Sequence, residues 1–93
     1  MAAESKLEKK IRVYAEDKGC LFLKFTSPGR KGVPDRILLA PGGRVVFVEL
    51  KAPTGRTSPR QGRVIQDMRD MGHDVRVIWS AVKGMELVDE TTS

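Results

Sequence analysis

The chain has 93 residues, enough for one hydrophobic core, and we expect a single domain over residues 1–93. Hydrophobic and charged residues make up 40% and 31% of it, which excludes a disordered chain, and no apolar run approaches the roughly 18 residues of a bilayer span. The net charge of +5 favours a polyanionic partner, and the single cysteine, Cys20, excludes an internal disulfide and a Cys/His zinc site.

The first third of the chain predicts a helix, a strand and a loop. Apolar residues recur at helical spacing between Glu4 and Lys18, and Gly19 is a natural end for this amphipathic helix. Residues 20–25 are apolar and aromatic, as in a strand. The loop that follows, residues 29–34, is basic and rich in glycine.

Residues 35–40 and 44–51 predict two further strands that pair with each other. Between them lies Pro41-Gly42-Gly43, which is typical of a tight turn, so the two strands should form a hairpin. The second of these strands is apolar on both faces until its last three residues, as in a buried central strand. We therefore expect both faces of the sheet to be covered.

The last third of the chain predicts a helix, a strand and a final short helix. A serine-proline pair begins the predicted helix over residues 58–72, and a glycine ends it. Residues 74–79 alternate like a fourth strand. Ser80 is a candidate cap for a short helix that continues to about Val88, and the polar tail, residues 89–93, should fray.

Positive charge is concentrated in residues 18–66. Ten Lys and Arg residues lie there against only two acids, Asp35 and Glu49, so this segment carries +8 while the flanks carry −3. Two carboxylates would weaken a surface built only to attract phosphate, so they need a function of their own.

The predicted hairpin brings these two carboxylates together. Asp35 stands at the entrance of the strand 35–40, directly after Pro34, and Glu49 and Lys51 are two residues apart on one face of the strand 44–51. In a hairpin, the start of one strand lies beside the end of the other. Asp35, Glu49 and Lys51 should therefore form one site.

This combination of side chains indicates metal-dependent phosphodiester hydrolysis. Two carboxylates in cationic surroundings suit Mg²⁺, which also binds waters and substrate phosphate oxygens. A lysine beside them can orient or help deprotonate a water, while the metal polarises the phosphate. Gln61 extends the apolar stripe of its predicted helix and is a candidate to face the site rather than solvent.

The segments Gly32-Val33-Pro34-Asp35 and Glu49-Leu50-Lys51, followed by Gln61, resemble the PD-(D/E)XK nuclease pattern of stand-alone VRR-NUC domains. The resemblance implies an α/β fold with a restriction-endonuclease-like αβββαβ core, in which a central mixed sheet is flanked by helices. It also implies dependence on Mg²⁺ or Mn²⁺, no organic cofactor, and a homodimer acting on branched or nicked DNA such as a Holliday junction. The polar N-terminal residues lack the apolar core of a signal peptide, so we expect a cytoplasmic protein. The resemblance implies that this is the cytoplasm of a bacterium or of a phage-infected cell.

The resemblance also implies roles for individual residues. The positions of Asp35 and Glu49 bind the metal together with the backbone carbonyl at Leu50, and Lys51 matches the catalytic lysine. Gln61 matches a motif glutamine. The family places a glutamate on the first helix as well, and we prefer Glu8 to Glu4 because it lies nearer the middle of that helix.

Other side chains are expected to bind nucleic acid or to form the core. Five cations around the proposed site are candidates for phosphate contacts: Arg30, Lys31, Arg56, Arg60 and Arg63. Four further residues are expected in the core, with a dimer interface as the alternative for some apolar positions: Cys20, Met68, Met71 and Trp79.

Plainer interpretations stay open for each residue and for the whole chain. Asp35 could be a turn aspartate, Glu49 and Lys51 an ion pair at a strand end, Gln61 a first-turn helix residue and Glu8 an exposed helix charge. The alternatives to a DNA endonuclease are a catalytically silent nucleic-acid-binding module and an RNA endonuclease.

Overall fold

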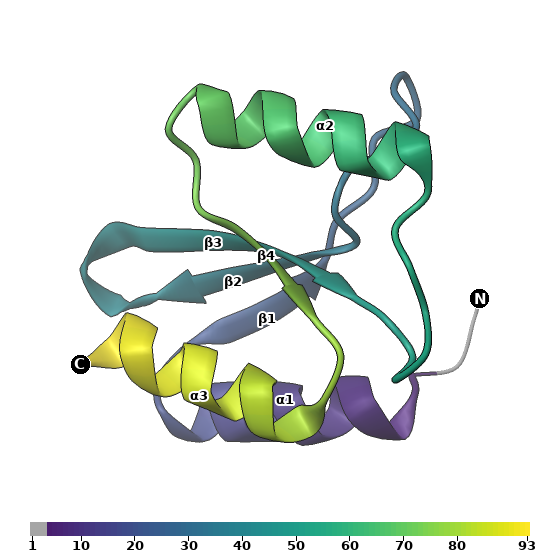
Figure 1. Ribbon diagram of the computed structural model, residues 1–93. Coiled ribbons are helices and arrows are strands. Elements are labelled where there is room, and N and C mark those ends of the chain that lie inside the picture. The colour runs from purple at the N-terminus through teal and green to yellow at the C-terminus, as the bar shows by residue number, and fades with distance from the viewer. Residues whose placement is uncertain (1–3) are drawn as a thin grey trace.

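A computed structural model describes residues 4–93 as an α/β fold (Figure 1). The elements follow the predicted order, with a 3-10 turn, η1, inside the hairpin. In chain order they are α1 (Lys6–Asp17), β1 (Leu21–Lys24), β2 (Arg36–Ala40), η1 (Pro41–Gly43), β3 (Arg44–Leu50), α2 (Pro59–Asp70), β4 (Val75–Ile78) and α3 (Ala81–Thr92).

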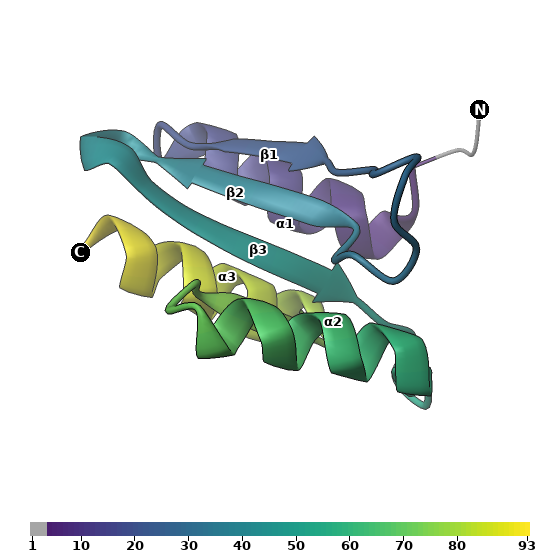
Figure 2. The same ribbon diagram turned by 90° about the horizontal axis from the view of Figure 1, so that it is seen from above.

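The four strands form one mixed sheet in the order β1-β2-β3-β4. β2 is antiparallel to both of its neighbours, β1 and β3, and β4 runs parallel to β3. Helices α1 and α3 cover one face of the sheet and α2 covers the other, as Figures 1 and 2 show. The expectation that both faces are covered is thus confirmed.

The main core lies between the sheet and the pair α1 and α3. Ile11, Leu38, Val48 and Val88 are at most 2% exposed there, because alternate residues of β2 and β3 point to this face. Gly84 of α3 packs directly against Ile11, so closely that an added Cβ would lie 2.6 Å from Ile11 Cγ1. Close contact between the two helices therefore depends on this glycine.

The turn between β2 and β3 sets the register of the hairpin. Gly42 and Gly43 have φ of 83° and 81°, a conformation that other residues rarely adopt. With the turn fixed, the ladder ends at the pair of Arg36 and Val48, and Asp35 and Glu49 stand one residue beyond this pair on the two strands. The hairpin thus places the two central acids opposite each other, as predicted.

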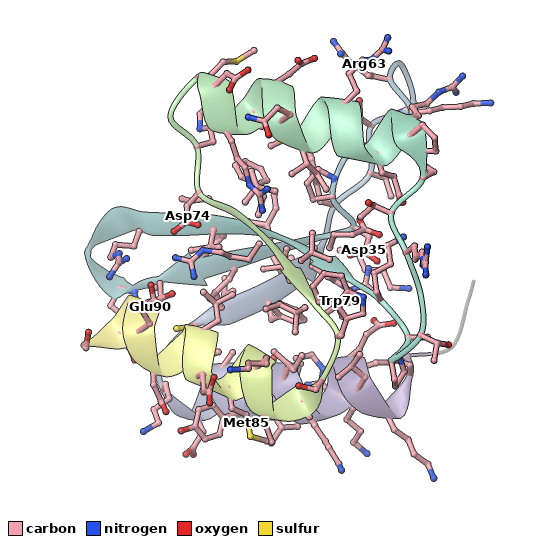
Figure 3. The ribbon with its side chains drawn as sticks, viewed as in Figure 1. Asp35, Arg63, Asp74, Trp79, Met85 and Glu90 are labelled. Carbon is pink, nitrogen blue, oxygen red and sulfur yellow. The ribbon has the colours of Figure 1, made fainter. Side chains whose placement is uncertain are left out.

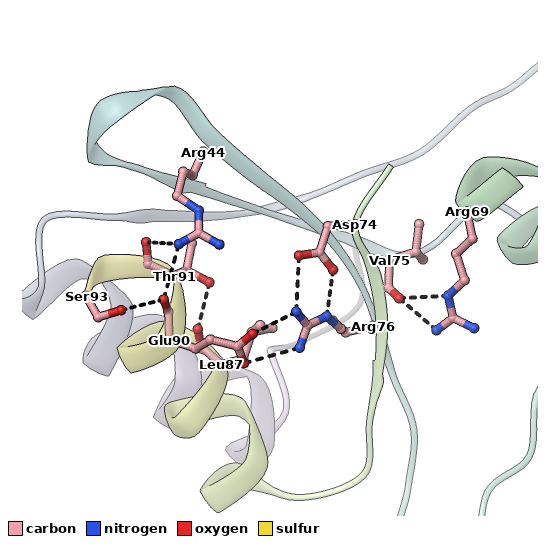
Figure 4. Close-up of polar contacts among 9 residues, drawn as sticks. All are labelled: Arg44, Arg69, Asp74, Val75, Arg76, Leu87, Glu90, Thr91 and Ser93. Atoms are coloured by element: carbon pink, nitrogen blue, oxygen red, sulfur yellow. Dashed lines mark hydrogen bonds and ion pairs between the residues drawn. The ribbon is translucent and has the colours of Figure 1, made fainter. Parts of the chain in front are cut away.

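The prediction that residues 89–93 fray is wrong, because α3 continues to Thr92. Contacts from distant parts of the chain hold the tail (Figure 4). Arg44 Nη1 of β3 donates to the carbonyls of Glu90 and Thr91, at 3.2 Å each. The Tyr14 hydroxyl donates to Asp89 Oδ1 at 2.7 Å, and the Thr91 hydroxyl is buried and donates within its own helix.

The expected core residues divide into buried and exposed ones. Cys20 is 3% exposed, between α1 and the sheet, and Met68 is half-buried. Met71 and Trp79, expected in the core, are 74% and 43% exposed. Met71 is the C-cap of α2, where the helix face no longer covers the sheet, and Trp79 follows the edge strand β4. Within residues 4–93, no helix is long and apolar enough to cross a membrane.

Candidate active site

At one end of the hairpin, the side chains of Asp35 and Glu49 each accept a hydrogen bond from a backbone amide of the opposite segment. The Asp35 amide donates to Glu49 Oε1 at 3.1 Å, and the Leu50 amide donates to Asp35 Oδ1 at 3.1 Å. The Phe25 amide donates to the Asp35 carbonyl at 2.9 Å, which extends the pairing of β1 and β2 by one residue. The site is therefore built into the sheet rather than attached to a free loop. Figure 3 shows Asp35 at the end of the sheet where α2 begins.

Lys51 and Gln61 complete a closed set of contacts with Glu49. Lys51 Nζ lies 3.2 Å from Glu49 Oε2 and donates to Gln61 Oε1 at 2.8 Å, while Gln61 Nε2 donates to Glu49 Oε2 at 3.1 Å. Gln61 is also part of the capping box of α2, since its Oε1 accepts from the Ser58 amide and its own amide donates to Ser58 Oγ. The start of α2 thus fixes the position of the amide group that holds the lysine.

Burial raises the pKa of both carboxyls. Glu49 is 3% exposed, and burial is the main cause of its raised pKa, with the negative charge of Asp35 adding to it and Lys51 opposing it. Burial also raises the pKa of Asp35, against the opposing hydrogen bond from the Leu50 amide. Two carboxylates are therefore held together where their negative charge is costly, and a nearby cation would stabilise them.

Glu8 reaches this site through Arg36, whereas Glu4 does not. Arg36 Nη2 forms an ion pair with Glu8, and Arg36 Nη1 donates to the Asp35 carbonyl at 2.7 Å. Burial disfavours the charged form of Glu8, but the hydrogen bond and charge of Arg36 outweigh it and lower its pKa. Glu4 instead pairs with Arg12 at 2.6 Å on the exposed side of α1.

Arg36 is the part of this site that sequence reasoning missed. It is one of the ten cations of residues 18–66, yet its side chain is only 10% exposed. Arg36, Leu38 and Ala40 alternate on the core-facing side of β2, so a charged residue there needs a buried partner. An arginine at a core-facing position beside Asp35 was a usable signal.

The donor set fits the predicted metal in its chemistry. Residues 4–93 hold no group of three or more His, Cys, Asp or Glu side chains placed to bind a metal, so two carboxylates and a backbone carbonyl are the set to consider. Mg²⁺ is commonly held by one or two carboxylates, with waters and substrate phosphate supplying the rest. Asp35 and Glu49 supply these two carboxylates, and the negative charge of Asp35 helps to raise the pKa of Glu49.

Four of the five predicted phosphate-binding cations gather beside α2. They line an open hollow of about 350 Å³ together with Gly29 and Val64: Arg30, Lys31, Arg60 and Arg63. Gly32, with φ of 91°, packs the loop against the helix, where an added Cβ would lie 3.0 Å from Arg60 Cγ. Arg56 does not line this hollow and lies in the loop between β3 and α2.

Comparison with known proteins identifies the family. The sequence model of the VRR-NUC domain matches residues 4–81 of the chain. The chain belongs to the VRR-NUC family. It is 40% identical over 75 residues to "Putative nuclease p44" of Acyrthosiphon pisum secondary endosymbiont phage 1, a match covering 81% of each chain. A solved structure of a VRR-NUC domain has a TM-score of 0.83 at 30% identity, covering 92% of this chain and 94% of that chain.

These similarities confirm the fold and the broad activity. The VRR-NUC protein has the predicted mixed sheet flanked by helices, and it is a nuclease whose substrate is a nucleic acid. The residue roles expected from the motif are consistent with the contacts described above and stay predictions.

Proposed function

We propose that this VRR-NUC protein is a Mg²⁺- or Mn²⁺-dependent DNA endonuclease that selects branched, nicked or junction DNA and acts as a homodimer. The observation that carries the proposal is the closed contact set of Asp35, Glu49, Lys51 and Gln61 at one end of the hairpin. A silent binding module would have no need to keep two costly carboxylates and a lysine in contact. The basic hollow beside α2 supports a phosphate-rich substrate.

In this mechanism Asp35, Glu49 and the Leu50 carbonyl hold the metal ion, which supplies Lewis-acid polarisation of the scissile phosphate when bound. Lys51 acts as the positioning and charge-stabilising group. An ammonium has three N–H donors, and contacts with Gln61 and Glu49 use two of them. The third is left for the attacking water or a phosphate oxygen. Gln61 and Glu49 keep the ammonium fixed, so little reorganisation is needed during the reaction.

A panel of end-labelled substrates tests the activity. Four-way junctions, flaps, nicked duplexes, plain duplexes and the matching RNAs are incubated with Mg²⁺, Mn²⁺ or EDTA. We expect cleavage of the branched or nicked DNAs with either metal and none in EDTA. Lys51→Met should reduce the rate by about 10²–10³-fold, as expected for loss of one preorganised donor. Cleavage of RNA alone would support the RNA endonuclease, and binding without any cleavage the silent module.

Metal binding and assembly have separate tests. Mn²⁺ should raise the Tm of the wild-type protein, because a ligand that binds only the folded state stabilises it, and it should not raise the Tm of Asp35→Asn. Equal shifts in both proteins would contradict the proposed ligands. Analytical ultracentrifugation at the concentration of the cleavage assay should give twice the chain mass of 10.3 kDa, and a monomer would contradict the homodimer.

A further inference from the structure

Trp79 is an exposed aromatic side chain that the proposed reaction does not use. The chain has five aromatic residues, all within the described residues 4–93, and Trp79 is the most exposed of them, at 43%. Its indole is held in place, because Nε1–H donates to the Gly55 carbonyl at 2.8 Å. A fixed, half-exposed ring offers a large contact surface without losing much side-chain freedom on binding.

The indole stands next to the candidate active site. Trp79 directly follows Ile78, which pairs with Leu50 and whose carbonyl accepts from the Lys51 amide at 2.9 Å. The loop that carries Gly55 folds back on the same lysine, since a Cβ on Gly55 would lie 3.5 Å from Lys51 Cβ. Trp79 and Asp35 lie at the same end of the sheet in Figure 3.

A hollow beside Trp79 differs in character from the basic one near α2. It measures about 380 Å³, and its apolar wall includes Trp79, Ile78 and Leu87. Its charged lining residues form two ion pairs, Lys83 with Glu86 at 3.1 Å and Arg76 with Glu90 at 2.9 Å, so together they add no net positive charge. Such a surface suits a flat, neutral group better than it suits a phosphate.

We propose that Trp79 is a stacking platform for an unpaired nucleobase adjacent to the scissile phosphate. The inference rests on the proposed action on nucleic acid and specifies how that action would favour branched substrates. Both faces of a base inside a duplex are covered by its neighbours, so only a base outside the stack can lie on the indole. The basic hollow then binds backbone phosphates while Trp79 detects strand separation.

Fluorescence tests the proposal directly, because Trp79 is the only tryptophan in the chain. The wild-type protein is titrated in EDTA with a forked DNA that has unpaired thymines and with a fully paired duplex of equal length. We expect the forked DNA to quench the emission and the duplex to leave it nearly unchanged. Equal quenching by the two DNAs, or none by either while both bind, would overturn the proposal.

Three variants separate stacking from a purely structural role. Trp79→Leu should weaken binding to the forked DNA by about 5- to 150-fold, the range for one stacked base, with less than about a twofold change for the duplex. Trp79→Phe keeps a ring but loses the hydrogen bond to Gly55, and it should retain most of the affinity. Val82→Ala, at a position that is 63% exposed on α3, should bind like the wild type.

The outcomes distinguish this proposal from the proposed activity. Equal weakening of forked and duplex binding by Trp79→Leu would mean that Trp79 only anchors the loop, and it would overturn the stacking role. Cleavage of branched DNA with unchanged rates in both Trp79 variants would overturn only this inference. Should Trp79→Leu prove unfolded by circular dichroism, the Phe variant and the wild-type quenching decide the question.

Discussion

Both carboxylate oxygens of Glu49 have partners although the residue is buried. Oε1 accepts from the Asp35 amide, and Oε2 accepts from Gln61 and pairs with Lys51. In residues 4–93, no buried side-chain nitrogen or oxygen lacks a hydrogen-bond partner. Because each group is held by several contacts, the candidate site is preorganised before any substrate or metal binds.

Asp35→Asn should abolish cleavage and raise the Tm. The raised pKa of Asp35 means that its ionised form destabilises the fold at neutral pH, whereas asparagine keeps an oxygen for the Leu50 amide without the charge. This cost disappears as the pH falls through the folded-state pKa. The Tm advantage over the wild type should therefore be largest near neutral pH and shrink in acid. Thermal melts in EDTA across this pH range measure it, and a lower Tm for the variant at neutral pH would contradict the prediction.

Glu8→Gln and Glu4→Gln form a matched pair that tests which glutamate serves the site. Glu8→Gln removes the closer of the two carboxylates that pair with the buried Arg36, the other being Asp35 at 3.8 Å, so we expect a loss of about 1–3 kcal/mol of unfolding free energy and slower cleavage. Glu4 lies in an exposed pair with Arg12, and its replacement should leave stability and rate close to wild type. Urea denaturation and the junction assay give both readouts. Slower cleavage by the Glu4 variant alone would reverse the assignment.

The sequence was sufficient for the central residues and insufficient for their surroundings. The two-residue period of a strand and the Pro41–Gly43 turn place Asp35, Glu49 and Lys51 together without any knowledge of the rest of the fold. The helix glutamate was harder, because Glu4 and Glu8 differ by one turn. Only the structure shows that Arg12 pairs with one of them and Arg36 with the other.

At the scale of elements, helices α1 and α3 approach closely at a glycine. Gly84→Ala should destabilise the protein by about 1–3 kcal/mol, because the added methyl group meets Ile11, although alanine favours helix formation. Gly62→Ala on α2, where nothing lies within 4 Å of the added Cβ, should instead stabilise it by about 0.5–1 kcal/mol. Thermal unfolding compares the two variants. Stabilisation by both would show that α1 and α3 can separate to accept the methyl group.

Elements with strong local signals were predicted within a few residues, and the exception was the end of α3. Capping serines at residues 5, 58 and 80 begin the three helices, and Gly19 and Gly72 follow the first two. The prediction for the tail was wrong because contacts with Arg44 and Tyr14, which lie far away in the sequence, hold this segment in place. Composition within residues 89–93 contains no trace of these contacts.

At the scale of the whole molecule, the basic charge is divided between faces. Replacing Arg60 and Arg63 by alanine should make the binding of duplex DNA less dependent on salt. The magnitude of the negative slope of log K against log salt, where K is the association constant, should fall by about 2, since each phosphate contact contributes about 0.9. Lys9 and Lys10 line a separate hollow formed by α1 and Met85 of α3. Replacing both by alanine removes the same charge and should leave the slope nearly unchanged. Fluorescence anisotropy across a salt series measures both. An equal change in the two double variants would indicate attraction by net charge alone.

The rate at which reagents label the buried thiol of Cys20 can measure how often the core of the protein opens. Cys20 is buried in the main core and burial raises its pKa, so thiol reagents can react only when this core opens. When reclosing is slower than labelling, the labelling rate equals the rate of core opening. When reclosing is faster, the labelling rate gives the free energy of that opening. A single native side chain thereby measures the opening of the core against which α1, the helix that carries Glu8, is packed. No engineered probe is needed.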